Sequence, residues 1–170
     1  MIAILYSFLW ILAALKFADR NWLPYYPTLL FASLGNALYE LICYKYQLWQ
    51  MEPNGLPVAM IPICLLIFIG MPISTWIFLS KYPYSKGISS QVLYIGFFVT
   101  IYIILEYFSV KGGAITYHHN WNLLWSLLFV IVMFIIIRIH HRRPMFALIL
   151  STIFTGFLCI IFDVTFNKMK

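Results

Sequence analysis

Near its carboxyl end the chain reads WNLLWSLLFVIVMFIII (residues 121–137), then RIHHRR (138–143), then PMFALILSTIFTGFLCIIF (144–162). A short basic segment thus separates two uncharged and strongly apolar segments. Each of the two is close to the roughly 17–25 residues that an α-helix needs to cross a bilayer. The pattern therefore predicts two membrane-spanning helices joined by a tight basic turn at the membrane surface.

The same pattern continues over the rest of the chain. Hydrophobic residues make up 64% of the 170 residues, charged residues only 9%, and the mean hydropathy is +0.91. Because a soluble domain is usually about 25% charged, this composition excludes a soluble globular fold. Charged residues divide the sequence into six long uncharged stretches: Met1–Leu15, Asn21–Tyr39, Pro53–Ser80, Gly87–Leu105, Gly112–Ile137 and Pro144–Phe162.

These stretches predict a single membrane domain over residues 1–170, an all-α, polytopic bundle of six transmembrane helices. Gly70 and Pro72 are expected to kink the third helix, and the glycines after Lys111 to end the fourth. The loops are too short to hold a soluble domain or to present a basic face to nucleic acid. The expected helices are at about 2–18, 28–44, 57–79, 91–107, 121–137 and 144–166.

The basic residues predict how the bundle is oriented. With six crossings, the loops after the first, third and fifth helices share one side. That side holds seven basic residues: Lys16, Arg20, Lys81, Lys86, Arg138, Arg142 and Arg143. The other side holds four: Lys45, Lys111, Lys168 and Lys170. Because cytoplasmic loops carry the excess of Lys and Arg, we expect both termini outside the cytoplasm.

Three acidic residues, Glu40, Glu106 and Asp163, are expected in apolar helices near the outer boundary. A carboxylate in hydrocarbon costs about 2.5–3.5 kcal/mol on insertion scales, so it normally faces the bundle interior, a partner or water. Asn36 lies one turn from Glu40 on the same helix face, and Tyr102 one turn from Glu106.

If the three acids converge, they could bind protons, a metal ion or an organic cation in a cavity open to the outer side. Tyr117, His118 and His119 follow on the same side and could complete a mixed oxygen and imidazole site. In a plainer interpretation, acids near the boundary reach the headgroups or pair with nearby lysines. The sequence specifies no metal.

Three arginines, Arg138, Arg142 and Arg143, lie in the basic turn. At a leaflet surface each would attract anionic lipid headgroups by about 1 kcal/mol. Most tryptophans and tyrosines fall where aromatic belts form at the two membrane surfaces. The deeper Trp10 is expected to be a packing residue.

The sequence contains no motif of a known enzyme class: no nucleophile elbow, zinc-protease helix, phosphate-binding loop or dinucleotide fingerprint. We therefore do not expect an enzyme, and no cofactor is predicted. The expected partners are the lipid bilayer and its anionic headgroups, with a second membrane protein or a homo-oligomer as further options.

The segment Leu105-Glu106-Tyr107-Phe108 is followed by an irregular series of glycine, aromatic and serine residues: Gly113, Tyr117, Trp121, Trp125 and Ser126. This stretch resembles the corresponding part of a family of small, uncharacterised multi-pass membrane proteins from spore-forming Gram-positive bacteria. Size and helix number are similar over essentially the whole chain. The resemblance implies a bacterial plasma-membrane location. Because that family has no established activity, it implies no functional residue.

Two hypotheses of function follow. The first is a protein that binds or permeates protons, cations or a small cationic solute through the outer carboxylates. The alternative is a structural or accessory subunit of a larger membrane complex, docked through small residues on its helices: Ala14/Ala18, Ser33/Ala37 and Thr152/Gly156. A substrate-capturing subunit of a vitamin importer is a third option, on size and helix count alone.

Overall fold

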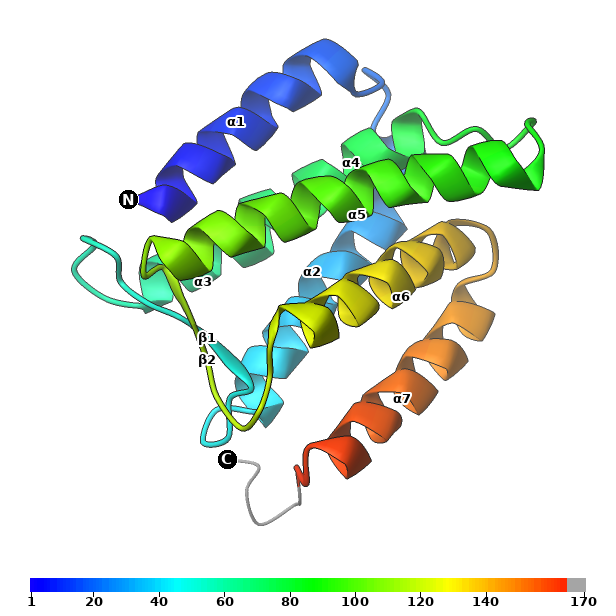
Figure 1. The fold of residues 1–170 in the computed structure, drawn as a ribbon. Helices are drawn as coiled ribbons and strands as arrows, with labels where there is room; N and C mark the ends of the chain where they lie inside the picture. The colour runs from blue at the N-terminus through cyan, green and yellow to red at the C-terminus, as the bar shows by residue number, and fades with distance from the viewer. Residues whose placement is uncertain (165–170) are drawn as a thin grey trace.

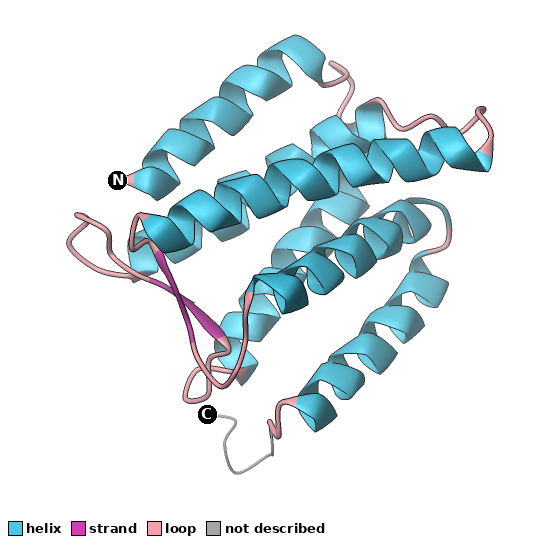
Figure 2. Cartoon of the chain, in the orientation of Figure 1, coloured by secondary structure: helices cyan, strands magenta, loops and turns pink. Residues whose placement is uncertain are grey.

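The structure is a computed structural model that describes residues 1–164, and it confirms the all-α class (Figure 1). Helices form almost all of the regular structure, and the two short antiparallel strands β1 and β2 form the rest (Figure 2). In chain order the elements are α1 Ile2–Phe17, η1 Leu23–Tyr25, α2 Tyr26–Ile42, β1 Trp49–Met51, α3 Met60–Leu65, η2 Leu66–Gly70, α4 Met71–Ser80, α5 Ile88–Lys111, β2 Ile115–Tyr117, α6 Leu123–Arg142 and α7 Pro144–Ile161.

Within residues 1–164, four helical segments are long and apolar enough to cross a membrane, against the six predicted. They are Met60–Ser80, Ile88–Lys111, Leu123–Arg142 and Pro144–Ile161. The shorter helices α1 and α2 have 16 and 17 residues. At 1.5 Å per residue they are about 24 and 26 Å long, against roughly 30 Å of hydrocarbon. The extended conformation of Ala18 ends α1, while Pro24 lies in η1 directly before α2 and Pro27 lies in the first turn of α2.

The segment Met60–Ser80 departs from α-helical geometry where the sequence predicts a kink. A π-helical turn, η2, occupies Leu66–Gly70 directly before Pro72. Proline has no N–H to donate, and its ring clashes with the carbonyl four residues earlier. The wider turn accommodates that clash, and Ser74 donates its hydroxyl proton to the Gly70 carbonyl at 2.6 Å.

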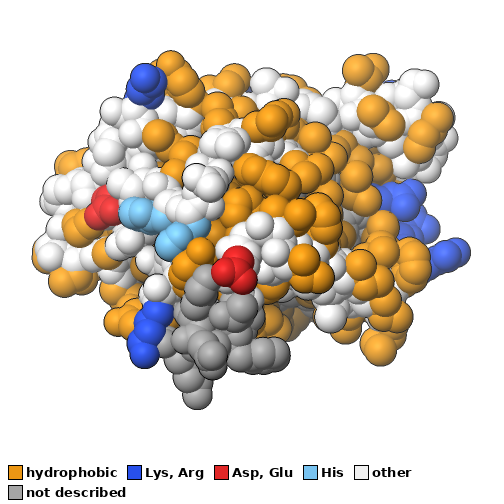
Figure 3. Space-filling model, turned by 60° about the horizontal axis from the view of Figure 1, so that its bottom comes forward, with side chains coloured by type: hydrophobic (Ala, Val, Ile, Leu, Met, Phe, Trp, Pro, Cys, Tyr) orange, Lys and Arg blue, Asp and Glu red, His pale blue; other side chains and the backbone are white. Residues whose placement is uncertain are grey.

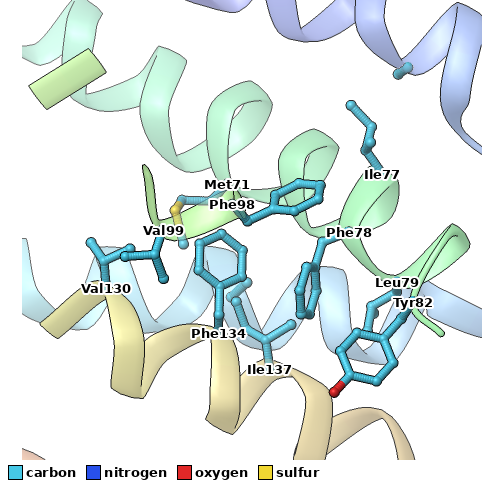
Figure 4. Close-up of a cluster of buried hydrophobic side chains, with 12 residues drawn as sticks. Met71, Ile77, Phe78, Leu79, Tyr82, Phe98, Val99, Val130, Phe134 and Ile137 are labelled. Atoms are coloured by element: carbon cyan, nitrogen blue, oxygen red, sulfur yellow. The ribbon is translucent and has the colours of Figure 1, made fainter. Parts of the chain in front are cut away.

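Three phenylalanines join α4, α5 and α6 at the centre of the bundle: Phe78, Phe98 and Phe134 (Figure 4). Phe78 and Phe134 are 0% and 1% exposed. The centroid of the Phe78 ring lies 4.8 Å from that of Phe134 and 5.2 Å from that of Phe98. Such tilted and edge-to-face pairs add to the free energy gained by burying the rings.

The loops after α1, α4 and α6 meet at one end of the bundle, and β1 and β2 lie at the other (Figure 1). Lys81, after α4, forms an ion pair of 3.3 Å with Asp19, after α1. The ring of Tyr25 stacks on that of His141, at the end of α6, with centroids 5.3 Å apart. Helices α1 and α7 lie at opposite edges of the bundle (Figure 1).

Much of the surface is hydrophobic, as a membrane-embedded protein requires. On the face in Figure 3, hydrophobic side chains spread widely, while acidic and histidine side chains form small patches. Leu15 in α1 and Ile160 in α7 are 81% and 82% exposed. Helix α7 packs mainly against α6, so most of its surface is left for lipid or a partner.

Helix α7 ends earlier than predicted, at Ile161. Asp163 adopts the left-handed conformation (φ 53°), its N–H donates to the Ile160 carbonyl at 3.4 Å, and the Val164 N–H donates to the Cys159 carbonyl at 2.9 Å. These are the two hydrogen bonds of a Schellman helix end, with aspartate at the position that glycine usually takes. Asp163 therefore lies beyond the helix, and positions 165–166 of the predicted helix lie outside the described residues.

Candidate functional site

A cavity of about 160 Å³ lies among the helices at the end of the bundle that carries β1 and β2. Its wall receives residues from α1, α2, the Met60–Ser80 segment, α5 and α6, and from both strands. Glu106 of α5 is the only carboxylate among the described residues that line it. Six aromatic side chains form much of the remaining wall: Tyr6, Trp10, Trp49, Tyr102, Trp121 and Phe129.

The strands β1 and β2 are held over this end of the bundle by Tyr39 of α2. The Tyr39 hydroxyl donates to the Trp49 carbonyl at 2.7 Å and accepts the N–H groups of Leu48 and Trp49, each at 2.9 Å. Its ring also stacks on that of Trp49, with centroids 4.7 Å apart. Trp49 then pairs with Tyr117 in the register of the two strands. One partly buried tyrosine thus fixes a ribbon too short to be stable alone.

A tight turn leads from β2 into α6. His119 and Asn120 both have positive φ, 50° and 63°, and the Trp121 N–H donates to the His118 carbonyl at 2.9 Å. Two successive left-handed residues define a type I′ turn. The turn brings Trp121 back over the start of α6, where it reaches the cavity wall.

The Glu106 carboxylate is held by two hydroxyl groups from other elements. Tyr117 of β2 donates to Glu106 Oε1 at 2.7 Å, and Ser126 of α6 donates to the same oxygen. The Trp121 indole N–H in turn donates to Ser126 Oγ at 2.8 Å. Burial and the hydrogen bond to Glu106 raise the pKa of Tyr117, so its hydroxyl remains a donor.

The hydroxyl groups on the wall are hydrogen-bonded within the protein. The hydroxyls of Ser7, Ser109 and Tyr6 donate to backbone carbonyls at 2.8–3.1 Å, and the Tyr102 hydroxyl bonds to Ser74 at 2.5 Å. Within residues 1–164, four polar groups of wall residues form no hydrogen bond: Glu106 Oε2, the side-chain amide of Asn36, and the indole N–H groups of Trp10 and Trp49. One carboxylate oxygen and one amide are therefore available as acceptors for a ligand.

Of the seven ligand-site residues predicted from the sequence, three line the cavity: Asn36, Tyr102 and Glu106. Glu40 is not on the described wall, and it accepts a hydrogen bond of 3.0 Å from Gln47. Asp163, exposed beyond the end of α7, is not on the wall either.

The predicted histidines also lie away from the described wall. His119 stacks on Tyr46 with ring centroids 3.6 Å apart, and His118 lies 3.2 Å from the Thr116 hydroxyl. Among residues 1–164, no group of three or more His, Cys, Asp or Glu side chains could hold a metal ion. The described residues therefore offer no metal centre of the kind considered from the sequence.

At the opposite end of the bundle, the three predicted lipid-binding arginines differ in their surroundings. Arg138 is partly buried, with its guanidinium 5.8 Å from the ring centroid of Tyr82 and 3.4 Å from the side-chain oxygen of Gln91. Arg142 is exposed, with its guanidinium 4.4 Å from the ring centroid of Tyr84. Arg143 is exposed in the turn before α7.

Three tryptophans of the wall were not predicted as part of a site: Trp49 and Trp121 were expected in an interfacial belt, and Trp10 as a packing residue. Tyr117, which was expected in that belt and also beside the two histidines, is not on the described wall but bonds to Glu106. Trp10 does pack on the core, but it also lines the cavity. One residue of the sequence could have indicated the hydrogen-bond network around Glu106. Ser126 is a polar residue in the apolar run 123–137, and its neighbours in the sequence do not explain its polarity. Its partner Glu106 is on another helix, which no local pattern indicates.

Searches with this chain found no matching protein-family model, curated protein or solved structure. The argument for function therefore rests on the fold and the cavity. Over residues 1–164 they define an all-α protein with four helices long and apolar enough to cross a membrane, and a mostly apolar cavity whose wall contains one carboxylate.

Proposed function

We propose that this protein is an integral membrane protein of the bacterial plasma membrane that binds a cation, a proton or a small cationic solute in its cavity. Glu106 supplies the negative charge, and Asn36 and Tyr102 complete the polar and aromatic wall. The location follows from the resemblance to membrane proteins of spore-forming bacteria, and the four apolar helices are compatible with it.

The observation that carries the proposal is the state of the Glu106 carboxylate. One of its oxygens accepts two hydrogen bonds, while the other has no partner among the described residues. The only ion pair in residues 1–164 joins Asp19 and Lys81 at the other end of the bundle. Among these residues, therefore, no basic side chain forms an ion pair with Glu106. An ionised carboxylate in an apolar cavity is stabilised by a bound cation.

The distribution of basic residues gives the direction of access. The loops that carry seven Lys and Arg meet at the end opposite the cavity. By the positive-inside rule that end faces the cytoplasm, so the cavity is near the outer surface. Arg138, Arg142 and Arg143 then contact anionic headgroups of the inner leaflet.

The test is thermal unfolding of the purified protein in detergent between pH 5 and 8, with alkali, alkaline-earth and organic cations. We expect at least one cation, or a proton, to raise the unfolding midpoint of the wild type and not that of Glu106→Gln. Glutamine keeps an oxygen that can accept from Tyr117 and Ser126, so the fold should be retained.

Asp163→Asn and Glu40→Gln are the matched controls, because each removes one negative charge away from the described cavity wall. Both should respond to the cation as the wild type does. A response that survives in Glu106→Gln, or the absence of a response to every cation and to pH, would overturn the proposal.

The accessory-subunit alternative is favoured by one observation. Thr152 and Gly156 lie exposed on α7, and a Cβ added at Gly156 would meet no atom within 4 Å. By contrast, Ala14, another predicted contact residue, is already buried in the bundle. A stoichiometric partner that co-purifies in mild detergent, and is lost from Gly156→Leu, would support this function instead.

A further inference from the structure

We propose, building on the cation site above, that its ligand is a compact organic ammonium ion with an apolar body of about one ring, and not a metal ion. Three features of the cavity carry this inference: its volume, its aromatic wall and the number of free polar groups. Each of them limits the ligand independently of the others.

The oxygen ligands of the cavity are poorly suited to a divalent metal ion. Calcium takes about 6–8 oxygen ligands, carboxylates prominent among them, and magnesium requires near-octahedral coordination. The cavity offers one carboxylate, from Glu106, and one amide, from Asn36, while the wall hydroxyls are neutral and are oriented by hydrogen bonds within the protein. A metal ion would have to retain most of its water shell in a mostly apolar space.

The aromatic wall fits an ammonium group. Cations are attracted to the faces of Trp, Tyr and Phe within about 6 Å of the ring centroid, and Trp gives the strongest attraction. Trp10, Trp49 and Trp121 all line the cavity that contains Glu106. An ammonium ion in this cavity lies among these rings and the carboxylate, while alkyl or aryl groups fill the remainder of the apolar space.

These rings are held in place by contacts with other side chains. Trp49 stacks on Tyr39 with centroids 4.7 Å apart, and the Trp121 N–H is fixed on Ser126. The Trp10 ring lies 6.0 Å from that of Tyr102. A wall that is already ordered loses little conformational entropy when the ligand binds.

The volume of about 160 Å³ sets the size of the ligand. An apolar cavity of about 150 Å³ in another protein is known to hold benzene. The free amide of Asn36 can bond one additional polar group. A primary or methylated amine on a single ring or a short branched chain therefore matches the site, whereas a large multi-ring cation does not.

The test compares benzylammonium with benzyl alcohol, its neutral analogue of nearly equal shape, by calorimetric titration of the purified protein in detergent. The expected result is that benzylammonium binds at least about tenfold more tightly, because a hydrogen bond to a charged group exceeds one between neutral groups. In Glu106→Gln the two affinities should become similar. Trp10→Leu should weaken benzylammonium binding by about 2- to 30-fold.

Sodium, potassium, calcium and magnesium chlorides form the second arm of the experiment. If a metal ion binds, Glu106→Gln abolishes metal binding, and benzylammonium does not bind, then the proposed ligand class is wrong and the cation site stands. Equal affinity for the alcohol and the amine in the wild type would also overturn the ligand class. If neither metal nor ammonium ions bind and pH has no effect that depends on Glu106, the proposed function itself fails.

Discussion

The Ser126 hydroxyl connects two groups of the cavity, so Ser126→Ala tests the network directly. The substitution removes a hydrogen bond to the Glu106 carboxylate and leaves the Trp121 indole N–H without its acceptor. Ser126 and Trp121 are 3% and 5% exposed, so water cannot easily replace the lost partner. A hydrogen bond to a charged group contributes about 1.5–3 kcal/mol and a buried unsatisfied donor costs about 1–3 kcal/mol. We expect a loss of about 3 kcal/mol of unfolding free energy.

For a chain of this length, 1 kcal/mol corresponds to a shift of about 2–4 °C in the unfolding midpoint, so Ser126→Ala should unfold about 6–12 °C lower. Tryptophan fluorescence in a mild detergent measures the midpoint. The matched control is Ser151→Ala, whose hydroxyl bonds only to the Leu148 carbonyl of its own helix. The Trp121→Phe variant lacks the indole N–H. In that variant, Ser126→Ala should lower the unfolding free energy by less than it does in the wild type, and the difference, the coupling energy of the two residues, should be about 0.5–3 kcal/mol. Equal losses in the two serine variants, or no coupling to Trp121, would refute the network.

Three further predictions concern the fold. Phe134→Ala removes a ring that is 1% exposed and should lower the unfolding free energy by about 3–5 kcal/mol. Phe97 is 60% exposed, so Phe97→Ala should change the unfolding free energy by less than about 0.5 kcal/mol. Thermal unfolding of the two variants measures this difference. Asp163→Val should lower the unfolding midpoint, because a β-branched residue is strained at φ 53°, while Asp163→Asn should not. The Tyr25 hydrogen bond, aided by Lys81, lowers the pKa of Asp19 below its ordinary 3.8. The ionised group therefore stabilises the fold above pH 4 and loses this effect as pH falls through its lowered pKa. For a pair as exposed as Asp19 and Lys81, the wild type should be more stable than Asp19→Asn by less than about 1 kcal/mol. This difference should disappear when the unfolding midpoints of both proteins are measured at decreasing pH.

Features set by local chemistry could be predicted from the sequence. The apolar composition predicted the all-α class, and Gly70 with Pro72 marked the place where the third segment leaves α geometry. The glycines after Lys111 marked the end of α5, where Gly113 has a positive φ of 66°. In each case the backbone conformation depends on residues within a few positions.

Features set by distant residues could not be predicted. Tyr117 and Ser126 reach Glu106 from 11 and 20 positions away in sequence, through a strand too short for alternation to indicate it. The ribbon also pairs Trp49 with Tyr117, which no periodicity shows. Six apolar stretches predicted six spans, but α1 and α2, with 16 and 17 residues, are shorter than the four segments that are long enough to cross a membrane.

The network around Glu106 explains how an apolar bundle holds a carboxylate that has no lysine partner among residues 1–164. Placing an acid in a transmembrane helix costs about 2.5–3.5 kcal/mol, and each hydrogen bond to its charged form returns about 1.5–3 kcal/mol. The two bonds from Tyr117 and Ser126 are therefore sufficient to keep Glu106 in place. The nearest basic residue on the same helix, Lys111, lies 5.9 Å from the ring centroid of Tyr107. Hydrogen bonds position the carboxylate, and no basic side chain among residues 1–164 pairs with it, which is the arrangement that the proposed cation site depends on.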